Sequence, residues 1–463
     1  MIHNIPQPVL EEEFTKLVEQ DSNMILRKGF SIHAVRQGEN EVVATVKEAR
    51  SGNFHDIIAR HLIACDGHKS KVREILNIPS EGEASNQVMM TIHFNANLRP
   101  VVGERVGMLF WIMDPLAVGV IIGYDLSGTQ VHISQMDISK RPLEWWTEEM
   151  CRAIIRTAIG QDVPFDILSF RPWIFRRQIA TTFQKGNVFL AGDAAHSFPP
   201  TGGLGLNCGL ADVHNLAYKV ALVHQNAAGP SILSTYTSER RSIADVYSKQ
   251  SVKNGKQILA LVQSLNTEGV EDITQARQNL TEALKNPKQR QKVDQEIEGQ
   301  KEHFDNSKRL LMPHITVQFS RGARVPHAWI SFTGSNRQGA SKLRQKPIDV
   351  SYVTELTAVQ VNRCQWSTLD LCNPNAFTLI LGEQESRENP RTSKVQTRFQ
   401  TINIQLNVWR LGIDFDVVDQ PWFASEIHRG GLLVRPDQHI IMRISHSTSR
   451  DKIISFLDSH IGI

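Results

Sequence analysis

Residues 186–223 read GNVFLAGDAAHSFPPTGGLGLNCGLADVHNLAYKVALV, and the rest of the chain is organised around this stretch. The pattern predicts a strand over residues 187–191, a Gly-Asp step, a loop rich in Pro and Gly, and a helix that begins near Leu206. Such a loop offers unpaired backbone N–H groups and the positive end of a helix dipole. We therefore expect it to bind an anionic or carbonyl-bearing ligand.

A short apolar strand with an acidic end comes earlier in the chain. Residues 61–65, HLIAC, are almost all apolar, which predicts a strand buried on both faces in a parallel sheet. The strand leads directly into DGHKSKVR, residues 66–73. An acid at the carboxyl end of a strand, followed by Gly and a Ser that can cap a helix, is typical of the crevice where open α/β sheets bind ligands. An ordinary strand-turn-helix with an N-cap explains the same residues.

Composition and charge indicate a folded protein of two or three domains. The 463 residues are 41% hydrophobic and 21% charged, and the net charge of +3 gives no argument for a nucleic acid or a membrane as a partner. The five cysteines are odd in number and have no C-x-x-C spacing, so we expect neither a disulfide framework nor a metal site. Residues 1–14 resemble neither a signal peptide nor a transit peptide, which predicts a cytoplasmic protein.

The first third of the chain alternates between helix and strand patterns. We expect a helix over residues 8–20, a hairpin formed by residues 29–36 and 41–47, and successive antiparallel strands over residues 86–136. The apolar run at residues 107–124 has Asp114-Pro115 at its centre, so it is interpreted as two strands joined by a turn rather than as a membrane span. A helix is expected next, over residues 143–159.

The second half predicts long helices and then a small α/β domain. Helices are expected over residues 230–265 and 271–311, and the charged second one is interpreted as a solvated face. Short strands are expected at 378–381, 404–409, 432–434 and 439–443, with a closing helix at 449–459. Residues 335–363 are polar and long for a loop inside a domain.

Taken together and in this order, the motifs resemble a known family. The order is a buried strand with DGHKSKVR, an antiparallel sheet, and a strand with GDAAHSFPPTGGLGLNCGLADVHNLAYKV. It is similar to the FAD-dependent aromatic hydroxylases, the flavoprotein monooxygenases typified by p-hydroxybenzoate and phenol hydroxylases. The C-terminal segment LLVRPDQHIIMRI, residues 432–444, resembles the thioredoxin-like domain of phenol hydroxylases.

The resemblance implies a set of FAD-binding residues. Asp193 would hydrogen-bond the ribityl chain, the Pro and Gly residues of the loop would bring backbone close to the isoalloxazine ring, and the first N–H groups of the helix would face the pyrimidine part of the ring. His196 would support the loop. No catalytic residue is implied. Tyr124, His132 and Arg171 are considered as residues of the substrate cavity, but a structural role is the favoured interpretation of each. The implied cofactor-binding residues are Gly192, Asp193, Pro199, Gly202, Gly203, Gly205, Leu206 and Asn207 in the stretch itself, with Asp66, Gly67 and Gln7 earlier in the chain.

One part of the family pattern is missing from the sequence. The family begins with a strand, a GxGxxG turn and a helix that hold the ADP half of FAD, and no GxGxxG occurs in this chain. The chain aligns just after that unit, so we expect an N-terminally truncated member. Truncation, recruitment to flavin-free chemistry and degeneration are competing explanations.

The expected fold is α/β (α+β), with an incomplete parallel FAD-binding sheet, an antiparallel substrate-domain sheet and a thioredoxin-like C-terminal domain. The expected domains are residues 1–85 (partial FAD-binding), 86–180 (antiparallel sheet), 181–312 (FAD motif and helices) and 313–463 (thioredoxin-like).

The resemblance implies an FAD-dependent monooxygenase that hydroxylates a phenolic or other aromatic small molecule with NAD(P)H and O2. A homodimer is considered as its assembly. The alternative is a flavin-free or inactive homologue that binds an aromatic ligand or catalyses a non-redox step.

Overall fold

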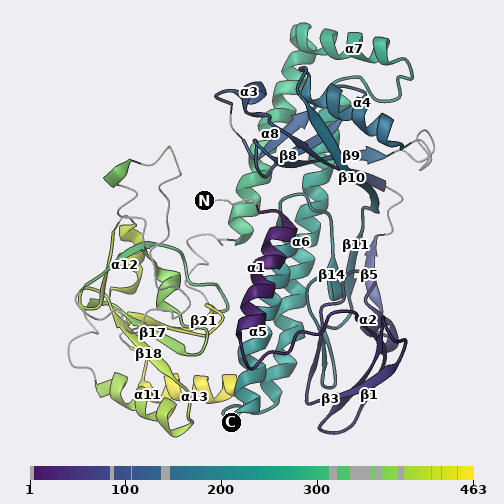
Figure 1. Ribbon diagram of the computed structural model, residues 1–463. Coiled ribbons are helices and arrows are strands. Elements are labelled where there is room, and N and C mark those ends of the chain that lie inside the picture. The colour runs from purple at the N-terminus through teal and green to yellow at the C-terminus, as the bar shows by residue number, and fades with distance from the viewer. Residues whose placement is uncertain are drawn as a thin grey trace. The chain divides into compact units, whose positions relative to one another are not determined.

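Figure 1 shows the computed structural model of the chain, whose residues group into two units. The first unit comprises residues 1–205 and 244–304, and the second comprises residues 206–243 and 305–463. The described residues are 5–83, 88–105, 107–136, 146–311, 321–333, 357–359, 366–383, 390–418, 420–428, 430–445 and 447–463. Most of the polar stretch 335–363 therefore lies outside the described residues. Of the helices described, none combines the length and the apolar character that crossing a membrane requires.

The first unit begins with a helix and an antiparallel sheet. The predicted helix and hairpin are confirmed, and a third strand extends the sheet in the order β1-β2-β3. Alternation of apolar and polar residues in β1 and β2 is the pattern that allows one face of an antiparallel pair to be covered. The elements are α1 (Gln7–Gln20), β1 (Phe30–Gln37), β2 (Val42–Glu48) and β3 (Phe54–Ala59).

A separate five-stranded antiparallel sheet of this unit has the order β10-β6-β9-β8-β7. Its prediction as successive strands is confirmed, including the two strands on either side of Asp114-Pro115. The strands are β6 (Val88–Ala96), β7 (Leu109–Ile112), β8 (Gly119–Gly123), β9 (Thr129–Met136) and β10 (Phe165–Ile174), with the short helix α3 (Arg99–Val102) between β6 and β7.

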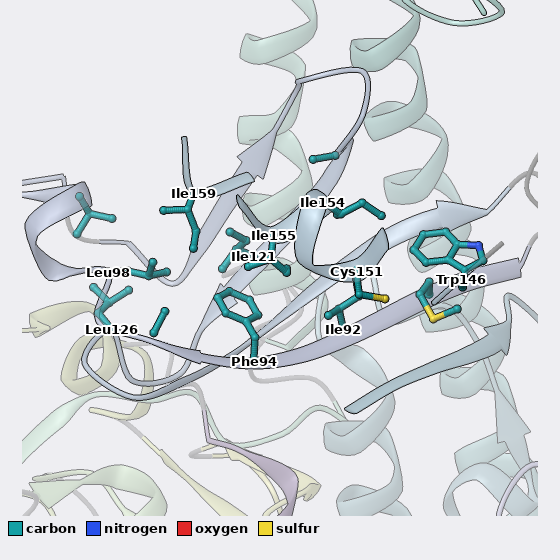
Figure 2. Packing of buried hydrophobic residues seen from close by; sticks show 14 of the residues in the cluster. Ile92, Phe94, Leu98, Ile121, Leu126, Trp146, Cys151, Ile154, Ile155 and Ile159 are labelled. Atoms are coloured by element: carbon teal, nitrogen blue, oxygen red, sulfur yellow. The ribbon is translucent and has the colours of Figure 1, made fainter. Parts of the chain in front are cut away.

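Helix α4 (Glu148–Ile159) covers one face of this sheet and completes its hydrophobic core. Thr147 caps its N-terminus by accepting from Met150 N, and Gly160 ends it in the left-handed conformation. Figure 2 shows the side chains of α4 above those of the strands. The labelled residues of this core are Ile92, Phe94, Leu98, Ile121, Leu126, Trp146, Cys151, Ile154, Ile155 and Ile159.

His132 lies in this sheet as a fully buried side chain rather than in an open cavity. It pairs with Ile92 across β6 and β9, and directly opposed residues project on the same face, which is the core face. Its Nε2 donates to the Ala117 carbonyl at 3.0 Å, and burial lowers its pKa to about 4. The structural role, which was the favoured interpretation of His132, agrees with this position in the core. Gly119 makes room for the ring, because a Cβ there would lie 3.0 Å from it and 2.2 Å from the Ile133 carbonyl.

Two further small sheets of this unit contain the strands that precede or belong to the predicted motifs. One has the order β14-β11-β5 and the other has the order β12-β13-β4, in which β4 and β13 run parallel. The elements are β4 (Leu62–Ala64), α2 (Lys71–Ile75), β5 (Ser80–Glu83), β11 (Arg177–Ala180), β12 (Gln184–Lys185), β13 (Val188–Leu190), the 3-10 turn η2 (Gly192–Ala194) and β14 (His196–Ser197).

The predicted long helices are confirmed, and the second prediction divides into two helices. Asp272 caps α7, and Asn286-Pro287 separates α7 from α8 because Pro favours the first turn of a new helix. Arg277 of α7 holds Asp114, in the turn between β7 and β8, with Nε 2.9 Å from its carboxylate. The helices are α5 (Leu204–His224), α6 (Ser231–Ser264), α7 (Ile273–Lys285) and α8 (Pro287–Leu311).

The second unit contains a four-stranded mixed sheet in the order β18-β17-β20-β21. β17 is parallel to β18 and antiparallel to β20, and its five residues are all buried. The predicted strands and the closing helix are confirmed. The elements are β15 (Trp329–Phe332), β16 (Trp366–Ser367), η4 (Thr368–Leu371), β17 (Phe377–Leu381), α11 (Pro390–Thr401), β18 (Leu406–Arg410), β19 (Phe415–Val417), α12 (Pro421–Ile427), β20 (Gly430–Val434), β21 (Ile440–Ser445) and α13 (Arg450–Ile461).

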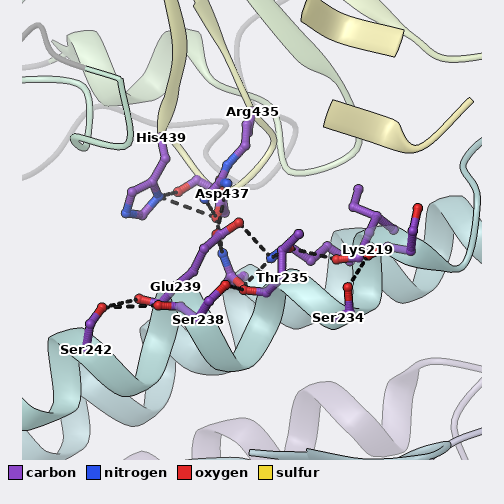
Figure 3. Close-up of polar contacts among 12 residues, drawn as sticks. Lys219, Ser234, Thr235, Ser238, Glu239, Ser242, Arg435, Asp437 and His439 are labelled. Atoms are coloured by element: carbon purple, nitrogen blue, oxygen red, sulfur yellow. Dashed lines mark hydrogen bonds and ion pairs between the residues drawn. The ribbon is translucent and has the colours of Figure 1, made fainter. Parts of the chain in front are cut away.

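A buried charge network joins α5 and α6 to the turn after β20 within this unit (Figure 3). Arg435 lies 2.7 Å from Asp437 and 2.9 Å from Glu239, while Lys219 donates to Asn215 at 2.9 Å. Burial lowers the pKa of Lys219 to about 8. Burial would raise the pKa of Glu239, but the charges of Arg435 and Lys219 outweigh it and lower that pKa to about 2. Because each buried charge has an opposite charge beside it, removing one member would leave another uncompensated.

The core under α4 predicts a large effect of truncating one side chain. Ile154 is fully buried, so Ile154→Ala should lower the free energy of unfolding by about 2 to 5 kcal/mol through lost burial and a residual cavity. Ile174→Ala is the matched control, because Ile174 of β10 is 44% exposed and should change stability by less than about 1 kcal/mol. Urea titrations followed by circular dichroism measure both variants, and equal losses would contradict the assignment of the core.

The buried His132 predicts acid sensitivity. Its folded pKa of about 4 lies below the ordinary 6.5, so neutral His132 contributes stability that is complete above pH 6.5 and is lost as the pH falls toward 4. The free energy of unfolding should drop by about 2 kcal/mol from about pH 7 to about pH 5 through this group. His132→Asn should remove that part of the pH dependence in urea titrations, whatever its own stability, whereas His55→Asn at an exposed site should retain it. An unchanged pH slope in His132→Asn would refute the prediction.

Candidate functional site

The parallel pairing of β4 with β13 brings the two predicted motifs to one edge of a sheet. Ile63 pairs with Phe189 and Ala64 with Leu190, and Ala191 N donates to the Ala64 carbonyl at 3.0 Å. Because the strands run in the same direction, the Asp-Gly step after β4 and the Gly-Asp step after β13 emerge at the same end. The parallel strand predicted for residues 61–65 is thus confirmed.

The expectation that this first strand is buried on both faces is wrong. Ile63, in the middle of β4, is 42% exposed, whereas the three residues of β13 are all buried. The reason is the strand order, because β4 has β13 as its one neighbouring strand in the part of the chain that the structure describes. An apolar strand sequence alone does not reveal how many neighbours the strand has.

Asp66 and Gly67 form the turn from β4 into α2. Ser70 caps α2 by accepting from Arg73 N at 3.0 Å, and Asp66 Oδ2 accepts from Val72 N at 3.1 Å. Both side chains therefore satisfy N–H groups that the first turn of a helix leaves unpaired. The ordinary strand-turn-helix explanation accounts for these contacts, and a role of Asp66 and Gly67 toward a ligand stays a prediction.

Arg73 physically joins the two motifs, and sequence reasoning gave it no role. Its Nη1 donates to the Ala194 carbonyl at 2.7 Å, and its Nη2 donates to the His68 carbonyl at 2.8 Å. Burial lowers the pKa of Arg73, and the Asp66 carboxylate partly offsets this effect. The last residue of DGHKSKVR therefore fixes the backbone directly after Asp193. Its position in that motif is the only sequence signal that could have pointed to it.

The Gly-Asp step presents Asp193 at the surface of the site. Gly192 has a φ of +57°, and the short turn η2 follows it. Asp193 is exposed, and within the part of the chain that the structure describes its carboxylate makes no hydrogen bond or ion pair. A carboxylate held on a fixed turn and left without a partner is available to accept hydrogen bonds from hydroxyl groups of a ligand.

The loop after β14 is shaped by turns and aromatic packing. His196 is buried and stacks on Phe198 with ring centroids 5.4 Å apart, which agrees with its expected supporting role. Gly203 N donates to the Pro200 carbonyl at 2.9 Å, which closes a turn. A Cβ built on Gly203 or Gly205 would meet no atom within 4 Å, so open space lies beside this backbone.

The remaining predicted residues lie at the starts of two helices. Leu206 and Asn207 belong to the first turn of α5, and Leu206 is 57% exposed. Gln7 is the first residue of α1, and its Nε2 donates to Glu11 of the same helix at 2.6 Å. That hydrogen bond stays within α1 and does not tie Gln7 to the two motifs.

Ser251 of α6 is the second residue to which sequence reasoning gave no role, after Arg73. Ser251 is fully buried, and its Oγ lies 2.9 Å from the carbonyl oxygens of both Pro199 and Thr201. The hydroxyl of Thr201 donates to the Ser251 carbonyl at 2.6 Å. Some 50 residues separate the loop from Ser251, so no local sequence signal links them.

The residues present fit one half of an FAD molecule better than the other. Three features suit a polyol and an electron-poor ring that gains negative charge: the open space beside Gly203 and Gly205, the start of α5, and the Asp193 carboxylate, which has no partner among the residues that the structure describes. For the ADP half, the chain contains no GxGxxG turn. The fit therefore concerns the flavin and ribityl portion.

Comparison with known proteins gives the family. A model described as an FAD binding domain matches residues 1–251, more than half of the chain. The chain is 28% identical to 2,4-dichlorophenol 6-monooxygenase of Delftia acidovorans over 436 residues, which is 89% of this chain and 71% of that protein. It is 35% identical to tetracenomycin A2 monooxygenase-dioxygenase of Streptomyces glaucescens over 228 residues, which is 47% of this chain and 41% of that protein.

The fold also matches a solved structure. The crystal structure of the flavin-dependent monooxygenase PieE in complex with FAD and substrate has a TM-score of 0.77 to this chain at 22% identity, covering 99% of this chain and 80% of that one. This likeness shows the mixed α/β fold. The family follows from the match over residues 1–251. The chain belongs to the FAD binding domain family.

Proposed function

We propose that this protein is an FAD-dependent monooxygenase that hydroxylates a phenolic or other aromatic small molecule. The observation that carries the proposal is the shared edge of β4 and β13, where the two motifs meet and Asp193 has no partner among the described residues. In the net reaction, NAD(P)H gives up a hydride, one atom of O2 enters an aromatic C–H bond, and the other atom leaves as water with one added proton. Bound FAD supplies this redox chemistry.

The chain's own residues bind and orient. Asp193 accepts hydrogen bonds from the ribityl hydroxyl groups, and Arg73 holds the backbone beside it through the Ala194 carbonyl. The first N–H groups of α5, at Leu206 and Asn207, stabilise negative charge on the ring. The loop Gly residues allow close approach of backbone to the ring, where a Cβ would intrude.

We assign the substrate to the face of the five-stranded sheet that points away from the core. Thr91 pairs with Ile133 and with Arg171, so these three side chains share that face. Trp173 belongs to the same face and donates from Nε1 to Thr91 Oγ1 at 2.9 Å, and Trp111 is 37% exposed. A half-covered surface of aromatic and β-branched residues suits an aromatic ring, and Arg171 offers a positive charge to a phenolate.

We also propose that the C-terminal part is thioredoxin-like. The order β18-β17-β20-β21 supports this assignment, with one parallel pair, two antiparallel pairs and helices α11, α12 and α13 between or after the strands. The division of the chain into four domains at residues 85, 180 and 312 stays a prediction. The homodimer also stays a prediction, which sedimentation velocity would test.

A flavin-free homologue that binds an aromatic ligand is the second candidate. Titration of the purified protein with FAD, with FMN and with riboflavin separates the two candidates. Flavin binding with absorbance in the visible range supports the monooxygenase. If the protein binds none of the three flavins but still binds a phenol, the second candidate replaces the monooxygenase.

The exposed Asp193 carboxylate leads to a prediction for flavin affinity. Asp193→Ala should weaken FAD binding about 10-fold to 100-fold, because a charge-assisted hydrogen bond is worth about 1.5 to 3 kcal/mol. Asp193→Asn should lie between the wild type and Asp193→Ala, since it keeps one acceptor oxygen. Fluorescence titration gives the dissociation constants, with Asp162→Ala at an exposed position of the same unit as control. Unchanged flavin stoichiometry and affinity in Asp193→Ala would contradict the assignment of Asp193 to the ribityl chain.

The hydrogen bond from Arg73 to the backbone leads to a second prediction for flavin affinity. Arg73→Met removes the hydrogen bond to the Ala194 carbonyl and should weaken FAD binding about 10-fold, whereas Arg73→Lys should recover part of the loss. Lys71→Met is the control, because Lys71 is exposed and pairs only with Glu74 in its own helix among its described ion pairs. If Arg73→Met and Lys71→Met bind FAD equally well, Arg73 does not organise the site.

A further inference from the structure

One face of α6 is built to receive the loop and a neighbouring strand. Asp245, Ser248, Ser251 and Gly255 are spaced three or four residues apart, which places them on one side of the helix. Arg177 of β11 donates from Nη2 to Asp245 at 2.7 Å and from Nε to Ser248 at 3.0 Å. Since β11 pairs with β14, which leads into the loop, α6 holds the strand beside the loop's entry.

The same face then holds the loop itself through reciprocal hydrogen bonds. Ser251 donates its single hydroxyl hydrogen to the carbonyls of Pro199 and Thr201, which it must share, and Thr201 donates back to the Ser251 carbonyl. Asn254 adds a weaker contact, with Nδ2 3.4 Å from the Thr201 carbonyl. Residue 201 is thereby fixed to one turn of α6 by both its backbone and its side chain.

Gly255 lies on α6 next to this contact. A Cβ at residue 255 would lie 3.3 Å from the ring of Phe175 and 3.8 Å from the Thr201 hydroxyl oxygen. The first distance is tight, so a side chain at residue 255 would crowd Phe175, whereas the second distance is an ordinary van der Waals contact. The Ser251 hydroxyl, rather than Gly255, therefore holds the loop on α6.

The fixed carbonyl of Thr201 also determines where the next N–H points. The peptide unit is planar and trans, so its C=O and N–H groups point in opposite directions. With the Thr201 carbonyl turned toward α6, the Gly202 N–H points away from α6, and it has no hydrogen-bond acceptor among the described residues. Gly202 has a φ of +104°, a conformation that glycine adopts without strain.

We propose that Ser251 is a positioning residue for the flavin. By holding the Thr201 carbonyl against α6, it keeps the Gly202 N–H turned outward as a donor to the bound ring before the cofactor arrives. Such preorganisation lowers the entropy lost on binding, and a fixed donor stabilises the negative charge of the reduced ring. This inference rests on the proposed function, because it assumes that the loop binds a flavin.

The test compares Ser251→Ala with Ser251→Thr, which keeps the hydroxyl, and with Ser264→Ala. Ser264 is the matched control, since it lies on the same helix and its hydroxyl donates to Leu261 of that helix. In the flavin-free protein, hydrogen exchange of the peptide over residues 198–206 should be about fivefold faster in Ser251→Ala, as loss of one hydrogen bond implies. Circular dichroism establishes that each variant is folded.

FAD titration and the reduction potential supply the remaining measurements. Ser251→Ala should bind FAD about fivefold to tenfold more weakly and should shift the flavin potential to more negative values. Ser251→Thr should restore both, and Ser264→Ala should match the wild type. A residue that only stabilised the fold would leave the potential unchanged.

The outcomes separate the two levels of the proposal. If the wild type binds FAD and Ser251→Ala matches it in loop exchange, affinity and potential, the role of Ser251 is refuted and the proposed function stands. If Ser251→Ala changes loop exchange but not the potential, Ser251 holds the loop without positioning a donor, and the inference is likewise overturned. If the wild type binds no flavin, the proposed function falls and the inference falls with it.

Discussion

The parallel pairing of β4 with β13 is the constraint on which the candidate site depends. Parallel strands end at the same edge, so two motifs more than a hundred residues apart emerge side by side. Arg73 then spans that edge with hydrogen bonds to the carbonyls of His68 and Ala194. Without this register, Asp66 and Asp193 would be two unrelated acidic turns. With it, they belong to one polar edge whose backbone is held in place.

Helix α6 supplies the second support of the loop. Hydrogen bonds from Ser251 and Thr201 fix the loop from behind, and Arg177 fixes the neighbouring strand through Asp245 and Ser248. Arg73 and Ser251 both bind carbonyl groups of the site's backbone, and the Thr201 side chain adds one hydrogen bond to α6. Among the described residues, the Gly202 N–H and the Asp193 carboxylate then have no partner, which is the arrangement that an electron-accepting ring with a polyol chain needs.

Much of the fold could be predicted because its signals are local. The helix at residues 8–20, the first hairpin and the strands on either side of Asp114-Pro115 follow from periodicity and turn residues, and the structure has them. One prediction was wrong, and one open alternative was decided, where the answer depends on neighbouring elements. Ile63 is exposed because β4 has one neighbouring strand in the described part of the chain, and His132 faces the core because its register with Ile92 sets its side of the sheet.

The sequence by itself determined the motifs, their order and the family, since a loop that must let backbone approach a ring needs Pro and Gly at fixed places whatever surrounds it. Only the tertiary structure decided which residues hold those motifs. Arg73 and Ser251 act on carbonyl oxygens, and a carbonyl is present at every residue, so nothing in the sequence marks the ones they bind. The pairing of distant segments, set by sheet register and helix packing, selects them.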